Sequence, residues 1–169
     1  MDASLLQADC ERCAALCCFA LAFDVSDSFP IDKPNGIVCP QLGANNRCKS
    51  YDKREELGYS GCMSFDCQGA GQKVTQEVFG GRSWRDEPAL LAEMTDAFVV
   101  MRRVHEQIAL LLTASALPLT AEECDLYDQF AHELSPPDGW TQELLEQYQI
   151  SGAEKRVKAF LMSLRHHVA

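Results

Sequence analysis

The sequence predicts a mainly α-helical protein, in which an irregular, cysteine-rich first half packs on an antiparallel helical assembly. Three observations lead to this fold class. Residues 1–85 contain eight of the nine cysteines and eight of the ten glycines. Apolar residues recur at helical spacing after residue 90, and helix-capping patterns delimit the segments that follow. We therefore divide the chain into residues 1–85 and 86–169, and we expect the two parts to pack as one compact unit.

The second part contains the clearest helix. Pro88 suits a first helical turn, and the apolar positions after it are spaced by three or four residues over about seven turns. These positions are Leu91, Met94, Phe98, Met101, Val104, Ile108 and Leu111. His105 lies on or beside the same apolar face, which predicts a buried histidine and no metal ligand.

Three further helices follow in residues 86–169. The capping box Thr120-x-x-Glu123 predicts the start of one helix, with Cys124 on its inner face. Thr141 predicts the start of a short helix, and a second capping box at Ser151 predicts the last one. That helix ends in Arg165, His166 and His167, and we expect the two histidines to be solvated.

The first part is expected to consist of loops and short elements, because proline and glycine interrupt it repeatedly. Its one longer helix-compatible stretch runs from Leu5 to Phe23. A helix there would place Cys10, Cys13 and Cys17 on one face, and Cys18 about 100° away from Cys17. Residues Lys73 to Phe79 form a second expected helix.

The cysteines of the first part carry the chemistry. Thiolates at short spacings either hold a soft metal or pair as disulfides. An all-sulfur environment suits zinc, cuprous copper or an iron–sulfur cluster, and both zinc and iron–sulfur sites commonly take four thiolates. Eight cysteines permit two such sites, or one with spare thiols. The candidate metal ligands are Cys10, Cys13, Cys17, Cys18, Cys39, Cys48, Cys62 and Cys67. For Cys18 and Cys124, packing as small apolar groups is the competing interpretation.

The charge distribution indicates a compartment and a class of partner. Acidic residues precede the first basic one, Arg12, so the N-terminus lacks the positive start of a secretory signal. We therefore expect a cytoplasmic protein with reduced thiols, the alternative being a secreted fragment whose signal was removed. The net charge of −10 disfavours nucleic acid, and the apolar stretches are too short for a membrane span. A protein partner is expected.

The spacing of the cysteines carries a family resemblance. Cys10-x2-Cys13-x3-Cys17-Cys18 is followed by Cys39-Pro40-x-Leu42, by Cys48-x2-Tyr51-x2-Arg54 and by Cys62-x2-Phe65-x-Cys67. This arrangement resembles the YkgJ-type cysteine-cluster family, described as zinc- or iron-chelating. The continuation from Gly61 through Trp84 is similar to a region ahead of the repeats in some bacterial pentapeptide-repeat proteins, although this chain contains no such repeat.

Three functions remain open at this point. The first is a metal-binding protein that holds an iron–sulfur cluster or zinc through cysteine thiolates and acts through a protein partner. The second is an iron–sulfur redox or accessory component of an enzyme complex, and the third is a disulfide-stabilised domain without metal. No catalytic acid, base or nucleophile stands out in the sequence, and the cysteines lack the strand–helix context of a thioredoxin-like redox site.

Overall fold

The computed structural model describes residues 1–168 and confirms the mainly α fold, with 57% helix and no strand in that range. Its α-helices are α1 (Leu16–Ala20), α2 (Ser60–Ser64), α3 (Ala70–Lys73), α4 (Leu91–Ala114), α5 (Ala121–Leu134), α6 (Gln142–Ser151) and α7 (Ala153–Ser163). Short turns of 3-10 helix lie at Ala3–Leu6, Cys10–Arg12, Tyr51–Lys53, Pro88–Leu90 and Leu164–His167, and a π-helical turn at Val74–Val78. Within residues 1–168, no helix is long and apolar enough to span a bilayer.

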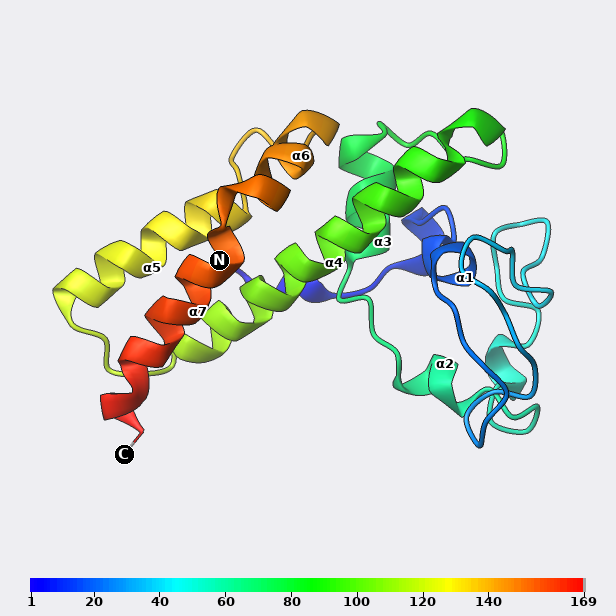
Figure 1. Ribbon diagram of the computed structural model, residues 1–169, viewed down its shortest axis with the longest axis horizontal. Helices are drawn as coiled ribbons and strands as arrows, with labels where there is room; N and C mark the ends of the chain where they lie inside the picture. The colour runs from blue at the N-terminus through cyan, green and yellow to red at the C-terminus, as the bar shows by residue number, and fades with distance from the viewer. Residues whose placement is uncertain (169) are drawn as a thin grey trace.

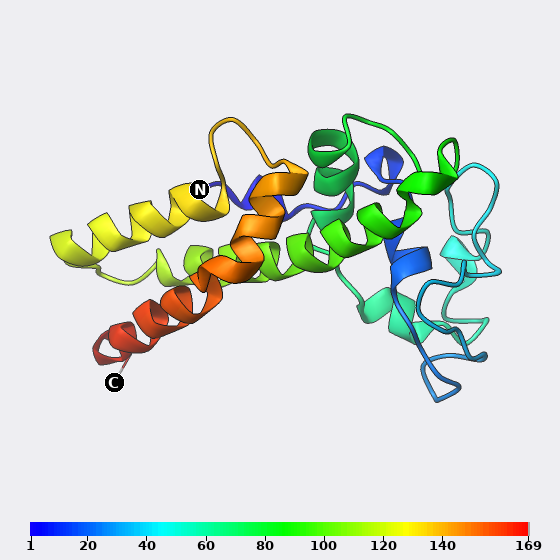
Figure 2. The ribbon, with the colours of Figure 1, turned by 45° about the horizontal axis from the view of Figure 1, so that its top comes forward.

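Helix α4 is the central element of the molecule (Figures 1 and 2). Toward its N-terminal end it packs against α1, α3 and the π-helical turn, and further along it packs against α5, α6 and α7. Its buried face includes all the predicted apolar positions except Leu91, which is partly buried at the edge. One continuous hydrophobic core therefore runs from Leu16 in α1, through Phe98, to Leu164 beyond α7.

The capping predictions are confirmed at two helices and wrong at a third. Thr120 and Glu123 form the predicted capping box of α5, and the Thr141 side chain accepts a hydrogen bond from the Leu144 N–H at the start of α6. Ser151 instead ends α6, and α7 begins after Gly152, whose φ of 72° turns the chain sharply. A left-handed glycine separates the two helices, so no capping box forms there.

The predicted helix from Leu5 to Phe23 is also wrong. The Asp9 side chain accepts a hydrogen bond from the Glu11 N–H and starts a single 3-10 turn. The chain is then extended at Cys13 and left-handed at Ala15, with a φ of 57°, before α1 begins. Cys10 therefore lies in the 3-10 turn, Cys13 in the extended link after it and Cys17 in α1, so the three share no helix face. Residues Lys73 to Phe79 do form helix, but most of that stretch is the π-helical turn.

Candidate metal centre

All nine cysteines are free thiols, and the eight candidates belong to the segment that forms the right-hand side of Figure 1, around α1 and α2. Cys39 is buried, Cys10 is exposed and the other six candidates are partly buried. Cys124 is exposed on α5, at the other side of the molecule. The prediction that Cys124 packs on the inner face of α5 is therefore wrong, because Tyr127, Phe130 and Leu134 provide the packing side chains there.

Cys13 is the most constrained of the candidate ligands. Burial raises the pKa of its thiol to about 12, against a lowering effect from the backbone amides of Leu16 and Ala15. Those amides face the sulfur because Ala15 adopts a left-handed conformation just before α1. On the opposite side is Gly71 of α3, where an added Cβ would lie 2.6 Å from Sγ of Cys13. The sulfur is thus held between α1 and a position of α3 that only glycine can occupy without displacing it.

The thiols form two electrostatic groups that share Cys17. Burial raises the pKa of Cys10, and negative charge at Cys17 and Cys67 raises it further. Cys17 and Cys67 act on the pKa of Cys13 in the same direction. In the second group, burial raises the pKa of Cys62, followed by charge at Cys39, Cys17 and Cys48.

Local backbone contacts hold the second group together. The N–H of Cys39 donates to the carbonyl of Cys18 at 2.9 Å, which ties the segment after Gly36 to the end of α1. An isolated antiparallel bridge joins Leu42 to Cys48. The neighbouring Cys18 side chain, with burial second, raises the pKa of Cys17 well above its ordinary value. Cys17 therefore belongs to both groups, and Cys18 lies beside it at the backbone contact with Cys39.

The spacing within these groups exceeds what a single zinc ion needs. Four thiolates at the usual zinc–sulfur distance of about 2.3 Å place their sulfurs about 3.8 Å apart. A metal ion needs at least three ligand atoms close together. Among residues 1–168, Glu123, His166 and His167 have ligand atoms that all lie within 4.8 Å of one another. No three of the candidate cysteine sulfurs meet this condition.

A buried lysine lies at the centre of the cysteine segment and was missed by the sequence analysis. The Lys33 side chain is 2% exposed. Its ammonium donates to the carbonyls of Phe19 (3.0 Å), Leu21 and Pro34 (3.4 Å). Burial lowers the pKa of Lys33, and negative charge at Cys39, Cys18, Cys17 and Cys62 opposes this change. The chain therefore places one fixed cation among the thiols whose ionisation it would stabilise.

His105 connects α4 to the segment that carries Cys67. The side chain is 1% exposed, as the sequence predicted, and its Nδ1 contacts the carbonyl of Gln68. Gln68 has a φ of 50° and Gly69 a φ of 79°, so the chain turns sharply directly after Cys67. Burial lowers the pKa of His105, which favours the neutral ring. His105 thus supports the backbone beside the candidate ligand Cys67, and its own ring is buried away from solvent.

One of these features left a signal in the sequence. Gly71 stands inside a segment that goes on to form helix, where glycine is disfavoured unless another group approaches closely. Lys33 precedes Pro34 in a breaker-rich stretch, and nothing in that stretch indicates that the lysine is buried. The prediction that both terminal histidines are solvated is wrong for His167, whose side chain is 9% exposed against Glu123.

Comparison with known proteins gives one informative relative. The chain is 38% identical over 114 residues to "Uncharacterized protein YybG" of Bacillus subtilis (strain 168). The matched stretch is 68% of this chain but 41% of that protein, so the chain spans less than half the length of its relative. No family model and no solved structure matches.

Proposed function

We propose that this protein binds metal through its clustered cysteine thiolates and acts through a protein partner. The observation that carries the proposal is the presence of eight free thiols, from segments spread over residues 10–67, four of which act on the pKa of one buried lysine. Thiols with raised pKa values and no disulfide partner have a clear use as metal ligands, because a bound cation stabilises the thiolate that burial disfavours.

An iron–sulfur cluster is the preferred occupant, and zinc is the second candidate. The sulfurs lie farther apart than one zinc ion requires, whereas a cluster of several atoms reaches thiolates that do not touch one another. Nearby backbone amides and a fixed cation are also the kinds of groups that tune the potential of such clusters. The two electrostatic groups suit two centres, with Cys10, Cys13 and Cys67 on one, Cys39, Cys48 and Cys62 on the other, and Cys17 shared between them. Cys18 is the weaker candidate ligand.

The setting of the centre supports reduced thiols in the cytoplasm and a protein partner. The acidic surface, with a net charge of −10, suits a basic protein surface better than nucleic acid. Several apolar side chains of the cysteine segment are exposed, among them Val25 at 61% and Ile37 at 55%. A second candidate function, as a redox or accessory subunit of an enzyme complex, follows if the centre is iron–sulfur, because Cys10 leaves one side of it open to solvent.

Anaerobic purification followed by iron, sulfide and zinc analysis tests the proposal. An iron–sulfur centre gives brown protein with equivalent iron and sulfide, and zinc gives colourless protein. Cys67→Ser and Cys62→Ser are each expected to remove about half of the metal if there are two centres, and all of it if there is one. The matched control is Cys124→Ser, which is expected to keep the wild-type content. Protein purified without metal that takes up none on reconstitution would refute the proposal.

A further inference from the structure

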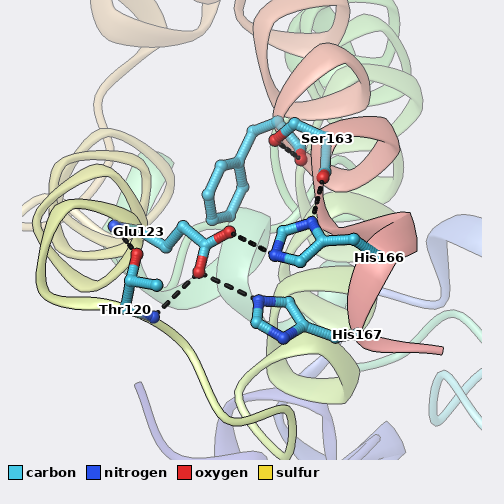
Figure 3. A network of polar contacts seen from close by, with 6 residues as sticks. Thr120, Glu123, Ser163, His166 and His167 are labelled. Carbon is cyan, nitrogen blue, oxygen red and sulfur yellow. Dashed lines mark hydrogen bonds and ion pairs between the residues drawn. The ribbon is translucent and has the colours of Figure 1, made fainter.

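A second group of ligand-type side chains lies where α5 begins and α7 ends, on the side of the molecule away from α1 and α2 (Figure 1), and Figure 3 shows it from close by. Glu123, in the first turn of α5, faces two histidines of the 3-10 turn that follows α7. Its Oε1 lies 3.5 Å from Nε2 of His166, and its Oε2 lies 2.9 Å from Nε2 of His167. Ligands on a tetrahedral zinc ion, at about 2.0 to 2.1 Å from the metal, lie about 3.3 Å apart. The two carboxylate–imidazole separations lie on either side of this value, and one ligand atom from each of the three residues lies within 4.8 Å of the others.

The surrounding hydrogen bonds orient these side chains. Nδ1 of His166 lies 2.9 Å from the carbonyl of Ser163, so this nitrogen donates to that carbonyl and the ring is held with Nε2 toward Glu123. Histidines that bind metals usually hold the other ring nitrogen in this way. Oε2 of Glu123 accepts the Thr120 N–H at 2.8 Å. That bond is the main cause that lowers the pKa of Glu123 to about 2, so the carboxylate is ionised at neutral pH.

The burial of the group leaves it accessible to a small ion. The side chains of His167 and Glu123 are 9% and 14% exposed, and that of His166 is 60% exposed. Two of the three side chains are therefore largely buried, and the third, His166, is open to solvent. Two imidazoles and one carboxylate suit zinc and related divalent transition ions better than calcium or magnesium, which prefer oxygen ligands alone.

We propose that Glu123, His166 and His167 bind one divalent transition-metal ion, with zinc as the expected ion. Three protein ligands leave the fourth position of a tetrahedral ion to water. The bound ion links the N-terminal turn of α5 to the end of the chain beyond α7 and closes this end of the helical assembly.

Zinc binding to the full chain, with its cysteines left as purified anaerobically, tests this proposal. Equilibrium dialysis against micromolar zinc is expected to add one ion per chain to the wild-type protein. His166→Gln, His167→Gln and Glu123→Gln should each weaken this added binding by at least tenfold. Gln at position 123 preserves the capping box of α5, so loss of binding there reports the missing carboxylate. The control is His132→Gln, which removes an exposed imidazole from the same helix.

A thermal unfolding series gives the second measurement. Zinc is expected to raise the melting temperature of the wild type and of His132→Gln, and to leave that of the other three variants unchanged. The proposal is overturned if the wild type gains no ion, if Glu123→Gln binds like the wild type, or if His132→Gln loses binding as well. The iron, sulfide and zinc content as purified should be equal in all five proteins, so failure here is distinguishable from failure of the cysteine centre.

Discussion

Replacing Gly71 by alanine tests the position of the Cys13 sulfur directly. The new Cβ would lie 2.6 Å from Sγ, and ordinary contact begins at 3.4 Å, so the sulfur or the helix must move by about 0.8 Å. Overpacking of this kind costs about 1 to 3 kcal/mol. Alanine also favours helix over glycine by about 1 kcal/mol, which partly offsets the strain in the metal-free protein. We therefore expect metal binding to fall much more than the stability of the metal-free fold.

The assay is metal content after anaerobic reconstitution, compared with urea unfolding of the metal-free protein. Gly71→Ala is expected to retain half of the wild-type metal or less, while its free energy of unfolding changes by no more than about 2 kcal/mol. Gly80→Ala is the control, because a Cβ there meets no atom within 4 Å although the left-handed backbone, with a φ of 61°, is strained. Wild-type metal content in Gly71→Ala would show that the Cys13 sulfur is not a fixed ligand.

Three further predictions concern the groups around the thiols. Lys33→Met leaves at least two backbone carbonyls without their ammonium donor; at about 1.5 kcal/mol or more for each charged hydrogen bond, unfolding free energy should fall by about 3 kcal/mol, as urea titration would detect. Trp84→Phe removes the 2.7 Å hydrogen bond from Nε1 to the Ala14 carbonyl and should cost about 1 to 3 kcal/mol in the same titration; an unchanged midpoint would contradict this role. Because burial raises the pKa of Cys13 from 9.0 to about 12, the metal-free protein should keep its full stability below pH 9 and lose stability between pH 9 and 12, as circular dichroism against pH would show. The metal-loaded protein should instead lose its metal on acidification, because protons compete for the thiolates, and metal release measured against pH tests this.

Helical periodicity in the second half made the fold predictable, and the same reasoning failed near the first cysteines. On α4 the apolar spacing alone identified the buried face from Met94 to Leu111, because burial of that face is what stabilises the helix. Between Leu5 and Phe23 the composition was equally compatible with helix. There the backbone turns at Ala15, because tertiary contacts with α3 override local propensity.

The candidate ligands were identifiable from the sequence, but their environment was not. Spacing singled out all eight cysteines of the first half, yet it could not reveal that Cys17 lies between two groups. The burial of Lys33 depends on three carbonyls from two separate segments, and no local pattern encodes such a long-range arrangement. Glu123 and His167 are likewise 44 residues apart. The sequence offers a local role for each that hides their pairing: Glu123 completes a capping box, and His167 lies in the basic last turn of a helix.

The packing of α1 and α3 on α4 has a consequence for biosynthesis. Cys67 is made before α4, and the apolar face that covers this segment is complete only when Ala114 has been added. At about 5 to 20 residues per second, the intervening 47 residues take roughly 2 to 9 s. During that interval the nascent chain carries its thiols without the helix that packs over this segment in the folded protein.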